Sequence, residues 1–170
     1  MLERKRKLDC ANGREKADLV LKNGNVLNVF TEEVLKADVA ICGDTIVGVG
    51  EYEGKEEIDC TGKYLVPGFI DAHMHIESCM AAPGELAKVL AKAGTTTIIA
   101  DPHEIVNVSG TKGMDYFLKC AAKLLVNVFF MVPSAVPATD VETNGCGEFL
   151  ASDMMKYVDN ARVLGLGETM

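Results

Sequence analysis

Four short apolar runs, separated by stretches that favour helices, constrain the fold of this chain more than any other feature. They occupy residues 69–75, 95–101, 127–132 and 163–168. Helix-forming composition lies between them at residues 84–93, 110–125 and 152–161, with Ser109 and Ser152 placed as N-caps. Strand, helix and strand repeating at intervals of about thirty residues predict an α/β fold. Its sheet is expected to be parallel, and the periodicity fits an open sheet as well as a closed barrel.

Residues 17–66 follow a different rhythm, in which short alternating apolar segments are interrupted by turn dipeptides. Asn23-Gly24 separates residues 18–22 from 25–29, and Gly43-Asp44 separates 37–42 from 45–49. Both dipeptides are typical of two-residue hairpin turns. We therefore expect a tail at 1–16, a small antiparallel β subdomain at 17–66 and a second domain at 67–170. The basic run at residues 4–7 is expected to belong to the solvated tail.

Composition excludes several classes of protein. The 170 residues carry a formal net charge of -8, which argues against a nucleic-acid partner because phosphate binding needs clustered Lys and Arg. The apolar stretch at 124–132 contains Asn127 and is too short to span a membrane. The six cysteines form no Cys-x-x-Cys pair, so we expect reduced thiols in a cytoplasmic protein.

All three histidines lie at the ends of predicted strands, where parallel α/β folds place their sites. His73 and His75 are two residues apart, so in a strand both side chains point to one face and can bind one metal ion. A pair of histidines with purely structural contacts is the alternative interpretation. The position of the pair at the end of the apolar run favours the metal site.

Carboxylates follow the same strand ends. Glu168 closes the fourth run after two glycines that allow a close approach of the backbone, although a solvent-facing loop residue fits the pattern as well. Asp101, His103 and Glu104 close the second run beside Pro102, and they could form an outer metal site, a substrate-facing loop or an ordinary turn. Glu77 could lie near the same centre or be an exposed loop carboxylate.

Residues 67–75, Pro-Gly-Phe-Ile-Asp-Ala-His-Met-His, resemble the first-strand motif of the amidohydrolase superfamily. Further stretches resemble the bacterial and archaeal adenine deaminases within it, at residues 75–80, 101–105, 133–139 and 164–168. Cys79 stands where that family usually has serine. The resemblance implies a small β-sandwich-like subdomain followed by roughly the first half of a TIM-type (β/α)8 metal-dependent hydrolase barrel, truncated after the fourth strand.

The resemblance also implies a reaction, the hydrolysis of adenine to hypoxanthine and ammonia in purine salvage. His73 and His75 would bind one of two divalent metal ions, manganese or iron with zinc also suited, and Glu168 would bridge them. Glu77 and Glu168 are the carboxylates expected to act in catalysis. A coordinated water, its pKa lowered from 15.7 to about 7, would attack C6 of the purine.

The family takes two more histidines and a proton-shuttling aspartate from later strands, and no histidine follows His103. We therefore expect the chain alone to be inactive. Completion by a homo-oligomer or a complementing chain stays open. So do two other functions, a hydrolase of other cyclic amides and a non-catalytic fragment or part of a split enzyme.

Overall fold

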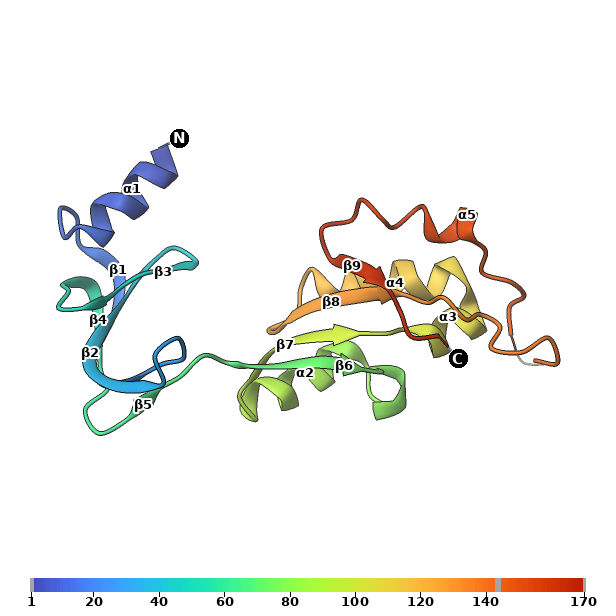
Figure 1. The fold of residues 1–170 in the computed structure, drawn as a ribbon, viewed down its shortest axis with the longest axis horizontal. Helices are drawn as coiled ribbons and strands as arrows, with labels where there is room; N and C mark the ends of the chain where they lie inside the picture. The colour runs from blue at the N-terminus through green and yellow to red at the C-terminus, as the bar shows by residue number, and fades with distance from the viewer. Residues whose placement is uncertain (1, 143–144, 170) are drawn as a thin grey trace. The chain divides into compact units, whose positions relative to one another are not determined.

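The computed structural model describes residues 2–142 and 145–169 and divides into two compact units, Met1–Pro67 and Gly68–Met170. Each unit has its own sheet, as Figure 1 shows. The chain is therefore a mixed α/β protein with one mixed sheet and one parallel sheet. In the described ranges, no helix is long and apolar enough to cross a bilayer.

One five-stranded sheet forms the framework of the first unit. Its main path runs β3-β2-β1-β4, and β5 pairs with the far end of β1. The strands are β1 (Ala17–Asn28), β2 (Glu33–Cys42), β3 (Thr45–Gly50), β4 (Gly54–Asp59) and β5 (Tyr64–Leu65). Strands β1, β2 and β3 are antiparallel, but β4 and β5 pair with β1 in parallel, so the expectation of a purely antiparallel sheet was wrong.

Asn23-Gly24 does not form the predicted hairpin turn. The two residues lie inside β1, where the register with β2 shifts between Leu21 and Gly24. Asn23 adopts a φ of 58°, and its backbone N–H donates to the buried carboxylate of Asp38 at 2.9 Å. A Cβ on Gly24 would lie 2.5 Å from a methyl group of Leu65, so the glycine allows close packing as well as the bulge. The predicted turn at residues 43–44 does connect β2 to β3.

The segment predicted as a solvated tail is instead mostly helical and packs on the sheet. Helix α1 (Leu2–Ala11) contacts β2 and β3. Cys10 is fully buried, and the Arg6 guanidinium pairs with Glu15 and Asp18. The prediction failed because Arg6 and Lys7 of the basic run pair with acidic residues in the sheet or next to its strands.

The second unit holds a four-stranded sheet in the order β6-β7-β8-β9, and the prediction of a parallel sheet is confirmed. Its strands lie side by side in Figure 1. They are β6 (Phe69–Met74), β7 (Thr95–Ala100), β8 (Asn127–Val132) and β9 (Val163–Leu166). The helical segments are η1 (Glu77–Cys79), α2 (Pro83–Lys92), α3 (His103–Ser109), α4 (Thr111–Ala121) and α5 (Ala151–Met154).

The core of this unit lies between the helices and the central strands. Ile98 of β7, Val128 and Phe130 of β8 and Phe117 of α4 are all buried in one apolar cluster. The structure adds α3, which follows Pro102 directly, and shortens the helix expected at 152–161 to four residues. Ser109 ends α3, and the caps of α4 and α5 are Gly110 and Leu150.

Candidate metal centre

Three histidines and three carboxylates meet at the carboxyl ends of β6, β7 and β9. Parallel strands end at the same edge of a sheet, so residues that follow them in sequence come together there. The group consists of His73, His75, Asp101, His103, Glu104 and Glu168. The chain thus gathers every histidine it possesses at one edge.

His73 and His75 point to the same side and toward Glu168. Their Nε2 atoms are 3.2 Å apart. The Glu168 carboxylate places Oε2 at 3.1 Å from His73 Nε2 and Oε1 at 3.9 Å from His75 Nε2. Two imidazoles and a carboxylate therefore converge on a single point, as a metal ion requires.

The orientation of His75 is fixed by residues that follow β7 in the chain. Its Nδ1 lies 2.9 Å from the Asp101 carbonyl oxygen and 3.2 Å from a Glu104 carboxylate oxygen. A carbonyl oxygen only accepts hydrogen bonds, so Nδ1 carries the proton and Nε2 presents a lone pair. Burial disfavours the charged imidazole, but the Glu104 carboxylate and the Asp101 carbonyl outweigh that cost and raise the pKa of His75. The site favours positive charge.

Asp101 is 0% exposed, and its carboxylate fixes the position of the Glu168 backbone. The backbone N–H of Glu168 donates to Asp101 Oδ2 at 2.7 Å. A Cβ on Gly167 would lie 2.3 Å from the same oxygen, so only glycine permits this approach. The glycines before Glu168 predicted that the backbone approaches another group closely, but the sequence did not identify Asp101 as that group.

His103 and Glu104 begin α3 and lie on the other side of His75. The rings of His75 and His103 have centroids 4.7 Å apart. Ser78 donates to Glu104 at 3.3 Å, a contact that the sequence analysis missed because no local pattern predicts it. The potential metal ligands that follow the second apolar run therefore lie next to His73 and His75.

The structure does not bring Glu77 into the cluster. Its Oε1 accepts the backbone N–H of Ile105 at 3.0 Å, within the first turn of α3, where N–H groups lack helical partners. Burial raises the pKa of the Glu77 carboxyl. The contact connects η1 to α3, and Glu77 belongs to none of the three potential ligand groups found among the described residues.

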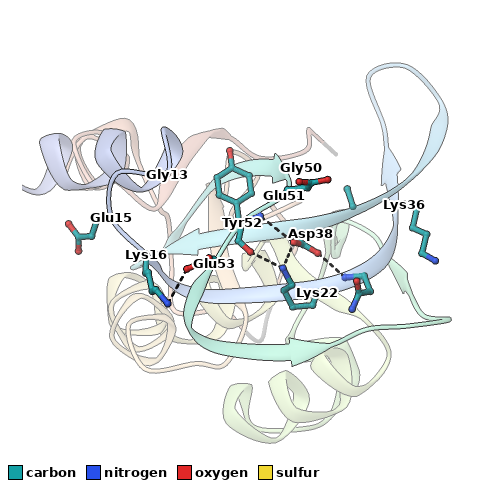
Figure 2. A pocket seen from close by; sticks show the side chains of 12 residues that line it. Gly13, Glu15, Lys16, Lys22, Lys36, Asp38, Gly50, Glu51, Tyr52 and Glu53 are labelled. Atoms are coloured by element: carbon teal, nitrogen blue, oxygen red, sulfur yellow. Dashed lines mark hydrogen bonds and ion pairs between the residues drawn. The ribbon is translucent and has the colours of Figure 1, made fainter.

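A cavity in the first unit has no histidine among its lining residues. Its volume is about 930 Å³, and Figure 2 shows Lys22 and Asp38 on its wall. Lys22 Nζ lies 2.5 Å from Asp38 Oδ2, and the backbone N–H groups of Asn23 and Tyr52 also donate to this carboxylate. The aspartate is therefore fully used in holding the bulge of β1, and we assign the cavity no chemistry.

The residues at the sheet edge fit a divalent metal ion. Two nitrogens bound at about 2.1 Å in tetrahedral geometry lie about 3.4 Å apart, close to the distance between the two Nε2 atoms. Both outer partners of His75 accept the Nδ1 proton, as is usual for histidines that bind metals. The donor set of imidazole and carboxylate suits manganese, iron and zinc.

Comparison with known proteins identifies the family. A family model described as "Amidohydrolase family" matches residues 64–164. The chain belongs to the amidohydrolase family. The match spans the whole parallel sheet up to β9, including His73, His75, Asp101 and His103.

Individual relatives of this amidohydrolase chain are adenine deaminases. One from Desulfitobacterium hafniense (strain Y51) is 58% identical over 158 residues, which cover 93% of the chain and 28% of the relative. Another, from Clostridium acetobutylicum, is 51% identical over 164 residues and covers 96% of the chain and 29% of the relative. The chain thus spans less than a third of the length of these relatives.

Solved structures with the same fold include more distant enzymes. Atrazine chlorohydrolase TrzN from Arthrobacter aurescens TC1, complexed with zinc, aligns with a TM-score of 0.63 at 17% identity, covering 87% of this chain and 46% of that one. A β-aspartyl dipeptidase from Fervidobacterium islandicum AW-1 has a TM-score of 0.61 at 22% identity, covering 91% and 41%. These similarities concern the fold alone.

Proposed function

We propose that this chain provides the first metal-binding strands of an adenine-deaminase-type hydrolase, which converts adenine and water to hypoxanthine and ammonia. The observation that carries the proposal is the convergence of His73, His75 and Glu168 in a chain that is 58% identical to an adenine deaminase over 158 residues. Purine is accordingly the proposed substrate.

The parallel sheet is proposed to be roughly the first half of a (β/α)8 barrel, and the first unit to be part of a sandwich-like domain. Strands β6 and β9 are the outer strands of the four-stranded sheet, and the apolar side chains of Ile70 and Leu166 are mostly exposed there. Further strands would pair with these edges and cover those side chains.

A divalent cation at this edge would supply Lewis acidity and lower the pKa of water for attack on a carbon centre. His73 and His75 would hold it through Nε2, with Glu168 as the third ligand. The Asp101 carbonyl and Glu104 would keep the His75 ring in the tautomer that binding needs. Manganese or iron is the proposed metal, and zinc suits the same donors.

The 170 residues supply two imidazoles and one carboxylate to this first cation position. With no histidine after His103, further ligands and a residue that delivers a proton to the leaving amine must come from elsewhere. We therefore propose that the chain needs additional barrel strands, in the same or another polypeptide, to turn over adenine.

A chimera tests the proposed substrate. The residues of the D. hafniense adenine deaminase that align with this chain are replaced by this sequence, and ammonia release is measured with adenine, hydantoin and dihydropyrimidine in the presence of Mn²⁺. We expect turnover of adenine, with a loss of at least about 10²-fold on His73→Ala because the metal is displaced.

Lys88→Gln, on the solvent side of α2, is the matched control and should leave turnover unchanged. A folded, metal-loaded chimera that hydrolyses a cyclic amide in preference to adenine would refute the proposed substrate. Turnover of adenine by the 170-residue chain alone would refute the need for further strands.

A further inference from the structure

We propose that Glu77 is a positioning residue, which acts through helix α3 to hold the Glu104 carboxylate against His75. Glu77 belongs to none of the potential ligand groups among the described residues, so its role differs from that of a metal ligand. The inference rests on the proposed function in one respect, since His75 is a proposed metal ligand. The contacts that carry it depend neither on a metal nor on a substrate.

The first turn of α3 has no side-chain cap within its own segment. Its N-cap residue is Pro102, which forms no side-chain cap hydrogen bond. The first N–H groups of a helix lack helical partners and are usually capped by Ser, Thr, Asp or Asn just before the helix. Here the N–H of Ile105 donates to Glu77 Oε1 at 3.0 Å. Glu77, 28 residues earlier in the chain, therefore takes the place of a local cap.

The same turn carries Glu104, whose carboxylate faces His75. One oxygen, Oε2, lies 3.2 Å from His75 Nδ1. The other, Oε1, accepts the Ser78 hydroxyl at 3.3 Å. Helix η1 thus holds this turn at two points, the backbone through Glu77 and the Glu104 side chain through Ser78. A shift of the turn would move the Glu104 carboxylate away from His75.

Packing holds the rest of α3 without Glu77. Val106 is fully buried, and its N–H donates to the Pro102 carbonyl oxygen at 3.1 Å. Helix α4 approaches closely, since a Cβ on Gly113 would lie 2.7 Å from the Ile105 carbonyl oxygen. We therefore expect α3 to remain folded when the Glu77 carboxylate is removed, and only its first turn to move.

The surroundings of Glu77 show what this side chain contributes. Its Oε2 is buried and has no hydrogen-bond partner among the described residues. A buried oxygen without a partner costs free energy that an apolar side chain would avoid, but an apolar side chain could not accept the Ile105 N–H. The contribution of Glu77 is therefore the acceptor Oε1. Glutamine offers the same acceptor, and replacing Oε2 by its amide nitrogen breaks no hydrogen bond.

A double-mutant cycle on Mn²⁺ affinity tests the inference, measured on the purified 170-residue chain by equilibrium dialysis after removal of metals with a chelator. Loss of an outer partner of a metal-binding histidine costs about 10- to 100-fold in affinity, and we expect a loss in this range for Glu104→Ala. Glu77→Ala should lose less. The double variant should lose no more than Glu104→Ala alone, because Glu77 acts through Glu104. Glu77→Gln should bind as the unsubstituted chain does, and so should the matched control Glu85→Ala, whose exposed carboxylate pairs only with Lys88 among the described residues.

Nitrogen-15 NMR of the metal-free chain at one fixed pH gives a readout that needs no metal. Glu104→Ala should shift the His75 Nδ1 resonance, Glu77→Ala should shift it in the same direction, and Glu77→Gln should leave it in place. Glu77→Met, which fills similar space without the carboxylate, replaces Glu77→Ala if circular dichroism shows that variant to be unfolded.

Two results would overturn the inference: losses of affinity that add in the double variant, or a His75 resonance that stays in place when the Glu77 carboxylate is removed. If the unsubstituted chain binds no Mn²⁺ but the resonance moves as expected, the metal site of the proposed deaminase fails and the role of Glu77 stands.

Discussion

At the scale of residues, the site depends on how closely the end of β9 approaches the end of β7. Gly167 allows Asp101 to accept the Glu168 N–H, and this bond places the Glu168 carboxylate between the histidines. The His-x-His spacing was readable from sequence, because alternation along a strand is a local rule. The Asp101–Glu168 contact joins residues 67 positions apart, and no local pattern predicts it.

Gly167→Ala tests this close approach. The added Cβ would lie 2.3 Å from Asp101 Oδ2, so we expect β9 or Asp101 to move, with a loss of about 1–3 kcal/mol in the free energy of unfolding. Mn²⁺ affinity, measured by equilibrium dialysis after removal of metals with a chelator, should fall as well because Glu168 is displaced.

Gly165→Ala is the matched control. Its Cβ would lie 3.4 Å from the flexible end of Met131, which can move aside, so stability and Mn²⁺ affinity should change little. Equal Mn²⁺ affinity in the two variants would contradict the role given to Gly167.

At the scale of elements, the sequence predicted the four strands of the parallel sheet within two residues at each end, because their apolar runs are bounded by turn and helix signals. It did not predict helix α3, since Asp101-Pro102 is as typical of a turn as of the residues that precede a helix. Asn23-Gly24 was misread for a similar reason. A left-handed asparagine serves a hairpin turn and a bulge alike, and only the distant Asp38 carboxylate decides between them.

Helix α1 shows the same dependence on distant partners. Arg6 hydrogen-bonds to Asp18 at the start of β1, and Lys7 lies 2.8 Å from Asp44 in the turn between β2 and β3. The Arg6 guanidinium, with the Gly43 N–H, holds the pKa of Asp18 well below its ordinary value. Lys7 lowers the pKa of Asp44 to about 2.

We therefore expect the ion pairs that hold α1 on the sheet to weaken at acidic pH. A carboxyl group with a lowered pKa in the folded state contributes stability above its unfolded pKa of about 3.9, and the contribution is lost as pH falls through the folded value. We expect hydrogen exchange at the amides of α1 to lose protection progressively below about pH 4, relative to those of β1.

Asp18→Asn should reduce the protection of α1 already at pH 7 and weaken its dependence on pH, whereas Lys5→Ala, on the exposed side of the helix, should behave as the unsubstituted chain. Protection that is equal at pH 7 and pH 3 would show that these ion pairs do not hold the helix.

At the scale of the whole molecule, the two units have separate sheets, and the potential metal ligands found among the described residues all belong to the second. The change of rhythm at residues 67–68 predicts a boundary between two domains close to this point. The sequence also predicted the parallel sheet, because strand and helix alternate. The pairing of β4 and β5 with β1 was not predictable, since register across a sheet depends on distant residues.

The central claim is that imidazoles and carboxylates at the end of the parallel sheet bind divalent metal. Crystals of the chain grown with Mn²⁺ and measured at the manganese absorption edge test it most directly. We predict an anomalous peak within about 2.3 Å of His73 Nε2, His75 Nε2 and a Glu168 oxygen. Ordered His73 and His75 side chains without an anomalous peak between them, at saturating Mn²⁺, would contradict it.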